Sequence, residues 1–275
     1  MRFIASHKTW FFRLFVVGLV IALAFPVHMS PFVLVLLVVN LFPSPRADGE
    51  RPRSVGIPVR GRWVALNSPG TRVPSHSVRS LGQAFAIDLV QARENEPPVK
   101  LGWGLRQAQP SDYLSFGADV VCAKNGVVVS LESRLRDHAA RSTWSGIIYM
   151  MTIEAICREL GGSRFVLGNH ITIDHGDGSF AVYAHLKEGS LNVQLGEQVE
   201  AGTVIASVGN TGNTSEPHLH FQLMDRANPS AAAGVPFQWP DAELTTSFDE
   251  RFTTRKATNR VLEGIPENGQ VFVSE

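Results

Sequence analysis

Hydrophobic positions are distributed unevenly along this chain, and its beginning differs from the rest. Over residues 10–42 the only formally charged residue is Arg13, and a proline-containing break separates two apolar runs, 14–25 and 32–42. Each run is shorter than the roughly 20 residues that a helix needs to cross a bilayer, but together they are long enough for one kinked crossing. The pattern predicts a retained membrane anchor over residues 1–42, with a cleaved signal peptide or a two-helix hairpin as alternatives.

After this apolar region the pattern changes to a linker and then to short alternating segments. Residues 43–54, "PSPRADGERPRS", are rich in proline and charge and are typical of a linker. From residue 55 onward, short apolar runs of period two are bounded by Gly, Asn and Asp, without the strand–helix alternation of a parallel sheet. We therefore expect a mainly β, antiparallel sandwich or barrel over residues 55–235, followed by a C-terminal extension over 236–275.

Individual elements follow from the same pattern. The predicted strands lie within 84–90, 118–131, 165–186 and 218–224, and "HGDGS" within the third is a Gly-rich connection of the kind that closes a hairpin. Residues 143–160, "TWSGIIYMMTIEAICREL", have helical spacing and end at two glycines. We expect this helix to be a peripheral insertion that packs onto the sheet, with a surface for a membrane or a partner as the alternative.

Composition narrows the function classes. The 25 basic and 25 acidic side chains balance, so nothing indicates a nucleic-acid partner, and 44% hydrophobic residues support a real core. The two cysteines, Cys122 and Cys157, have no spacing typical of a metal site, and either a disulfide or two free thiols fits their positions.

Two histidines stand one residue apart in "EPHLHF", residues 216–221. On a strand, His218 and His220 would project from one face, while the two apolar residues beside them face a core. The preceding run, "GEQVEAGTVIASVGNTG", has the pattern of a biotinyl or lipoyl carrier domain, but no lysine occurs over 188–255 to carry the cofactor. The paired histidines are therefore the candidate functional residues of this segment.

Three motifs together resemble a known family. "GNHITIDHGDGSFAVYAHL", "GEQVEAGTVIASVGNTG" and "SEPHLHF" occur in the order and approximate spacing of the M23 zinc metallopeptidases, or lysostaphin-like endopeptidases, which cut peptide bridges of bacterial peptidoglycan. The resemblance extends roughly from residue 61 to residue 225. Three linked motifs in order are more specific than one His-x-His pair.

The resemblance implies roles for five residues. By analogy with the family, His76, Asp88 and His220 hold a zinc ion, and His185 and His218 lie beside it and handle protons. Two imidazoles and one carboxylate would leave the fourth tetrahedral position open, as in catalytic zinc sites. The residues alone do not assign acid and base between the two proton-handling histidines.

The first motif departs from the family. The usual pattern places a histidine four residues before the aspartate, but Ala84 stands there, and the nearest candidate is His76, twelve residues before Asp88. We predict that a lengthened loop folds back to bring this imidazole to the metal. Were it only a surface residue, zinc binding would be weak or absent.

Other polar residues near the motifs are weaker candidates. His170 and Asn169 are expected to contact substrate, although Asn169 is equally explained as a turn residue after Gly168. His175 is interpreted as the start of the hairpin connection, and His138 as part of a charged, solvated face.

These expectations combine into a zinc-dependent endopeptidase whose partner is peptidoglycan peptide. The alternative is a catalytically inactive domain of the same fold that binds peptidoglycan or regulates another cell-wall hydrolase. Basic residues flank the apolar region on both sides, so charge does not settle orientation. The substrate class predicts a cell-membrane protein with its peptidase domain outside the cytoplasm.

Overall fold

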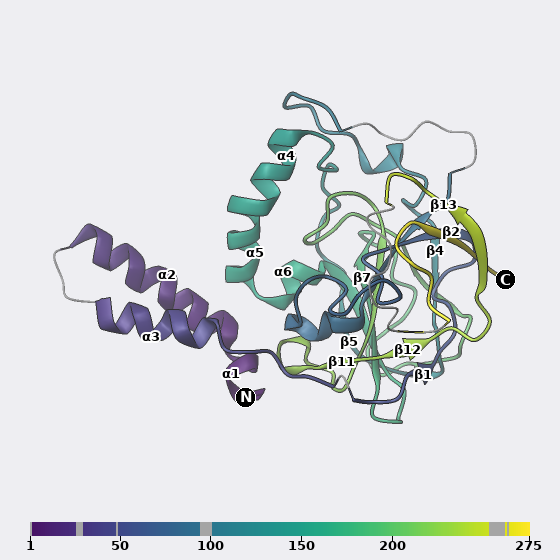
Figure 1. Ribbon diagram of the computed structural model, residues 1–275, viewed down its shortest axis with the longest axis horizontal. Coiled ribbons are helices and arrows are strands. Elements are labelled where there is room, and N and C mark those ends of the chain that lie inside the picture. The colour runs from purple at the N-terminus through teal and green to yellow at the C-terminus, as the bar shows by residue number, and fades with distance from the viewer. Residues whose placement is uncertain (1, 26–29, 48, 94–100, 253–261, 263) are drawn as a thin grey trace.

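The computed structural model describes residues 2–25, 30–47, 49–93, 101–252, 262 and 264–275. In them the chain forms a β domain with an exposed helical insertion along one side and N-terminal helices that extend away from it (Figure 1).

Antiparallel pairing dominates the β domain. The main sheet is formed by β2 (Gly61–Leu66), β3 (Ile87–Gln91), β5 (Gly126–Glu132), β6 (Asn169–Asp174), β7 (Phe180–Leu186), β8 (Gln198–Val199), β10 (Leu219–Met224), β11 (Gly234–Val235), β13 (Glu243–Phe248) and β14 (Gln270–Ser274). Within the described residues the strand order is β13-β14-β2-β3-β10-β7-β6-β5-β8, with β11 also paired to β10. The predicted mainly antiparallel β fold is confirmed.

Short strands outside the main sheet make two smaller pairs. β4 (Asp119–Val121) pairs antiparallel with β9 (Val204–Ser207), and β1 (Arg53–Ser54) pairs parallel with β12 (Phe237–Gln238). The end of the expected linker is thus attached to the β domain. Short 3-10 segments complete the connections: η1 (Ser80–Phe85), which contains a kink, η2 (Pro110–Asp112) and η4 (Pro229–Ala231).

Strand β10 lies near the centre of the sheet and separates two environments. Leu219, Phe221 and Leu223 are fully buried in the main hydrophobic core, as their alternation predicts. His220 and Gln222 point to the other face, where a smaller apolar cluster contains Met224. The alternation of this one strand therefore places its histidine outside the main core.

The β6–β7 hairpin forms as predicted, with the Gly-rich turn at 175–179 between its strands. Its first strand begins later than expected, at Asn169, because residues 163–167 form the short helix α6 (Ser163–Leu167). Gly168 separates the two with a φ of 70°, and a Cβ there would lie 2.4 Å from the Thr211 carbonyl oxygen. Only glycine suits that position.

The predicted helix at 143–160 is present but packs differently from the expectation. It consists of α4 (Trp144–Tyr149), a π-helical turn η3 (Met150–Glu154) and α5 (Ala155–Gly161), and the Thr143 hydroxyl accepts a hydrogen bond from the Gly146 amide at its start. Large apolar side chains along it are exposed to solvent instead of covering the sheet: Ile148, Tyr149, Met151, Ile153 and Ile156. The expectation of packing onto the sheet is therefore wrong for this face.

The apolar N-terminal region forms helices α1 (Arg2–Ser6), α2 (Lys8–Ala24) and α3 (Ser30–Asn40). Helices α2 and α3 lie side by side (Figure 1), with Gly18 against Val33 and Phe32. Among the described residues no helix has the length and apolar character required to cross a membrane. The expected single kinked transmembrane segment is therefore not supported.

Contacts join this N-terminal region to the rest of the chain. Arg13 Nε donates to the Leu160 carbonyl over 2.8 Å, and Arg2 forms a 2.6 Å ion pair with Asp225.

Cys122 is buried and Cys157 is exposed, and both are free, so the disulfide alternative is not formed.

The expected C-terminal extension contributes strands β13 and β14 to the main sheet, where β14 pairs with β2. Phe272 on β14 is fully buried, and its ring centroid lies 5.6 Å from that of Trp239. Trp239 in turn contacts Phe221, on the strand that carries His220. The C-terminal residues thus support the site strand through an aromatic cluster.

Truncation of Phe272 tests that support. We expect Phe272→Ala to lower the free energy of unfolding by about 3–5 kcal/mol, because it removes a fully buried ring and leaves a cavity. Phe248→Ala on neighbouring β13 is the matched control, since that side chain is 43% exposed and should change stability by only about 0.5 kcal/mol. Urea unfolding of the two variants measures both values. A loss for Phe272→Ala as small as that for Phe248→Ala would show that the C-terminal strands are not part of the core.

Candidate metal centre

Adjacent strands of the main sheet bring three site residues together. Asp88 on β3 lies directly opposite His220 on β10, and His220 lies opposite Ala184 on β7. His185, the next residue, has a φ of 61°, which interrupts the alternation near the end of β7. Its ring centroid lies 5.7 Å from that of His220, so both imidazoles meet in one space.

His76 reaches the same space from a loop. The Ser75 amide donates to the Ala84 carbonyl over 3.0 Å, so the loop folds back onto the residue four positions before Asp88. Within the intervening turn, Leu81 and Gly82 have φ values of 58° and 73°, and this left-handed stretch reverses the chain. The lengthened loop thereby places its imidazole beside the sheet.

His76, Asp88 and His220 form a compact set of donors. One potential ligand atom from each lies within 4.8 Å of those of the other two. His76 Nε2 is 3.0 Å from Asp88 Oδ2, and His220 Nδ1 is 2.8 Å from Asp88 Oδ1. The Asn67 side-chain amide also donates to Asp88 Oδ2 over 2.8 Å, which fixes the carboxylate plane. These three residues could hold a metal ion.

The pKa values of Asp88 and His220 are shifted in opposite directions by their mutual contact. Burial raises the pKa of its carboxyl, but the charges of His76 and His218 and the hydrogen bonds from His220 and His76 outweigh that effect and hold the pKa well below 3.8. For His220, burial lowers the pKa, and the hydrogen bond and charge of Asp88 more than reverse this, so the pKa is raised above 6.5. The metal-free site therefore has an ionised carboxylate beside a readily protonated imidazole.

Gln222 fixes the orientation of His220. Its amide nitrogen donates to the Leu81 carbonyl over 2.8 Å, so its oxygen faces His220 Nε2 at 2.9 Å. That oxygen only accepts, so His220 donates from Nε2, and Nδ1, which donates to Asp88 when the ring is protonated, is the nitrogen that a metal would take. Such a partner determines which ring nitrogen is available to a metal.

His185 and His218 stand beside the donor set with defined tautomers. Nδ1 of His185 donates to the Thr211 carbonyl, and Nδ1 of His218 donates to the Glu216 carbonyl, each over 2.8 Å. Because a carbonyl only accepts, each ring in its neutral form presents a bare Nε2 to the site. Burial, and then the charges of His218 and His220, lower the pKa of His185 well below 6.5, so it is neutral at pH 7.

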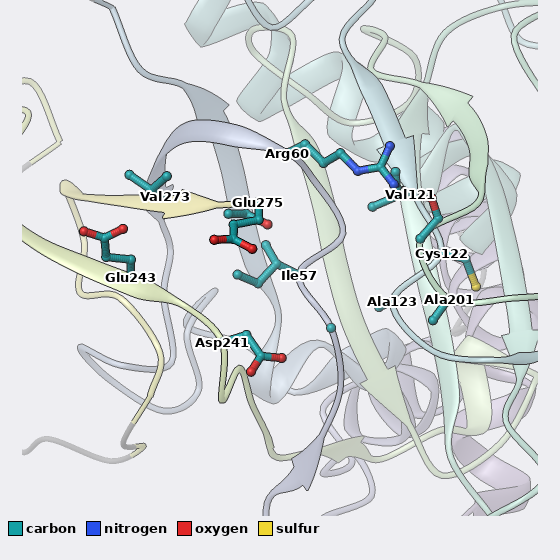
Figure 2. A pocket seen from close by; sticks show the side chains of 13 residues that line it. Ile57, Arg60, Val121, Cys122, Ala123, Ala201, Asp241, Glu243, Val273 and Glu275 are labelled. Carbon is teal, nitrogen blue, oxygen red and sulfur yellow. Dashed lines mark hydrogen bonds between the residues drawn. The ribbon is translucent and has the colours of Figure 1, made fainter.

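These residues line a pocket of about 250 Å³. Half-buried Met150 of the helical insertion and Val166 and Leu167 of α6 form part of its wall, so the insertion contributes to the site. A larger cavity of about 510 Å³ shares none of the lining residues of the first. Arg60, Cys122 and Asp241 are among its lining residues (Figure 2). The chemistry of the sequence motifs is therefore in the smaller pocket.

Comparison with known proteins agrees with this arrangement. Residues 113–232 match the family model of peptidase family M23. The predicted resemblance to peptidase family M23 is confirmed over this segment.

Relatives of this chain include the DD-carboxypeptidase/endopeptidase Mpg of Neisseria meningitidis, 36% identical over 109 residues, which are 38% of this chain and 24% of Mpg. The Peptidoglycan DD-endopeptidase ShyA of Vibrio cholerae is 38% identical over 71 residues, 25% of this chain and 16% of ShyA. The chain thus spans a quarter or less of the length of these relatives. Among solved structures, the catalytic domain of lysostaphin from Staphylococcus simulans is similar to this chain. The match covers 55% of this chain and 77% of the lysostaphin domain, with 21% sequence identity and a TM-score of 0.32.

The matched M23 segment contains His185, His218 and His220 but begins after His76 and Asp88. These two residues are supplied by the segment with the lengthened first motif. The structure brings all five residues into one pocket, although the two earliest lie outside the family match.

The structure places Asn169 and His170 elsewhere. Asn169 is fully buried, and its amide both accepts from the Leu135 amide and donates to the Leu135 carbonyl. His170 is buried on β6 and its Nδ1 donates to the Gly168 carbonyl. Neither residue lines the pocket. Both residues hold the backbone near the site, and their expected contacts with substrate stay a prediction.

Sequence reasoning missed Gln222, Asn67 and Glu216. Gln222 had a usable signal, because it stands two residues after His220 on the same strand and must share its face. Asn67 and Glu216 lie just outside strands, where no periodicity indicates the direction of a side chain.

We expect the metal affinity of this site to fall with decreasing pH, with a midpoint above 6.5. A proton on His220 Nδ1 competes with the metal, and the pKa of that imidazole is raised above 6.5 in the metal-free protein. Asp88 stays ionised throughout, because its pKa is well below 3.8. Calorimetric titration of metal-free protein between about pH 5 and about pH 8 measures the midpoint. A midpoint below 6.5 would contradict this account of the His220–Asp88 contact.

Proposed function

We propose that the protein is a zinc-dependent endopeptidase that hydrolyses peptide bonds of bacterial peptidoglycan. The convergence of His76, Asp88 and His220 beside two further histidines supports the proposal. The name of the relative ShyA describes a peptidoglycan endopeptidase, and we extend that substrate class to this chain.

The donor set fits a catalytic zinc ion. Two imidazole nitrogens and one carboxylate oxygen are ligands that zinc prefers, and three protein donors leave one tetrahedral position for a non-protein ligand. When bound, zinc would supply Lewis acidity that polarises a peptide carbonyl and favours attack by water near neutral pH. Asn67 and Gln222 would hold the ligands Asp88 and His220 in place.

His185 and His218 provide the proton transfers that hydrolysis requires. One proton leaves the attacking water and one reaches the leaving amine, so two positioned imidazoles match the need. Neutral His185 presents Nε2 as an acceptor and is suited to take the first proton. His218 is the second group, with Nε2 3.6 Å from Asp88 Oδ1 and its ring 4.8 Å from that of His185.

Zinc loading and digestion of purified peptidoglycan test the proposal. We expect the purified protein to bind one zinc ion, to lose activity after chelation and to regain it when zinc is added. Mass spectrometry of the released fragments identifies the bond that is cut. Zinc binding without cleavage would favour the alternative of an inactive domain that binds peptidoglycan or regulates another hydrolase.

We further propose that the domain acts outside the cytoplasm, because peptidoglycan lies outside the cytoplasmic membrane. An alkaline phosphatase fusion at Glu50 would be active in that case, whereas a reporter that is active only in the cytoplasm would overturn the location and the substrate together.

A further inference from the structure

Glu216 stands between the metal pocket and a second, smaller cavity. The pocket of about 250 Å³ and a neighbouring space of about 20 Å³ share Val90 and Glu216 in their linings. Arg93, Tyr113 and Arg251 line the smaller space. Glu216 therefore has the metal site on one side and basic side chains on the other.

The backbone around Glu216 is held firmly. Its carbonyl accepts hydrogen bonds from the Thr214 hydroxyl over 2.7 Å and from His218 Nδ1 over 2.8 Å. Pro217 follows and restricts Glu216 to extended conformations. The preceding carbonyl, of Ser215, accepts from the Arg141 amide. The residue that orients the proton-transfer group His218 is thus itself fixed at the rim of the pocket.

The carboxylate of Glu216 has few partners. In the described part of the chain its oxygens form no hydrogen bond or ion pair, although the side chain is only partly exposed. Burial, together with the charge of Asp249, raises the pKa of Glu216 more than the charges of His218, Arg251 and Arg93 lower it. A partly desolvated carboxylate in a binding pocket is stabilised when a ligand supplies a donor.

We propose that Glu216 selects substrates that have a protonated amine close to the scissile bond. The proposal rests on the peptidase function proposed above and specifies its substrate class. An ammonium group would form a charge-assisted hydrogen bond with the carboxylate. A neutral, acylated amine would lose the charged contact.

Two peptides that differ only at that amine test the proposal. One is a cross-linked peptide with a free amine next to the scissile amide, and the other has this amine acetylated. We expect zinc-loaded wild-type protein to favour the free amine by roughly 10- to 100-fold in kcat/KM. Glu216→Gln should bring this ratio close to one. Glu243→Gln, at an exposed carboxylate of the distant large cavity, should leave the ratio unchanged.

A ratio that is the same in wild-type protein and Glu216→Gln would overturn the proposal. If the wild-type protein cleaves neither peptide, the peptidase function fails, and the proposal on Glu216 is then decided by binding. Calorimetry with metal-free wild-type and Glu216→Gln proteins compares the affinities for the two peptides. A preference for the free amine that depends on Glu216 supports recognition without catalysis, and equal affinities reject it.

Discussion

Asparagine at position 88 is expected to abolish metal binding and to lower kcat/KM by on the order of 10³-fold or more. Asp88 is the only carboxylate of the donor set described here, and it contacts both His76 and His220. Asparagine has nearly the same shape but lacks the negative charge that attracts a cation and orients both imidazoles. Elemental analysis for zinc and peptide-cleavage rates measure the two effects.

The matched control is Asp119→Asn, the same change at an exposed carboxylate on β4. It should leave zinc content and activity unchanged. Thermal unfolding of the metal-free variants separates a lost ligand from a lost fold. If Asp88→Asn retains one tightly bound zinc ion, the assignment of this residue as a ligand is wrong.

Alanine at position 218 is expected to have a different signature: a loss of about 10²- to 10⁴-fold in kcat with zinc content retained. His218 lies beside the donor set but is not one of its three members. Its removal takes away a proton-transfer group while His76, Asp88 and His220 remain. Steady-state kinetics together with zinc analysis distinguish this outcome from that of the ligand variants.

Two other histidine variants serve as controls for the His218→Ala result. His76→Ala should lose both zinc and activity, because it removes a donor. His175→Ala, in the β6–β7 turn outside the pocket, should lose neither. Were His218→Ala to lose zinc as completely as His76→Ala, His218 would have to be counted as a ligand.

Sequence could predict the parts of this molecule in which side-chain direction follows from periodicity. Alternation along 219–224 indicates which residues enter the core, and the same alternation places His220 on the opposite face. The hairpin at 169–186 follows from two β runs around a Gly-rich turn. Each of these features depends on neighbours in sequence, so local rules suffice.

Features that depend on distant contacts were not predictable in this way. The position of His76 depends on a hydrogen bond between Ser75 and Ala84 and on a left-handed turn at Leu81, and no periodicity encodes either. For the helical insertion, the sequence predicts the helix but not its environment. Its spacing predicts a helix, yet spacing alone does not reveal that residues such as Met151 and Ile153 face solvent.

The side-chain alternation of strand β10 links correct folding to formation of the metal site. Its six residues include both core side chains and a candidate metal ligand, because Leu219 and Phe221 face one side while His220 and Gln222 face the other. A slip of one residue would exchange the two sets and would bury an imidazole in the core while exposing a phenyl ring in the pocket. A misregistered chain would therefore lack the donor set as well as stability. Metal capture would then report on folding, since it would discriminate correctly assembled molecules from those that are merely collapsed.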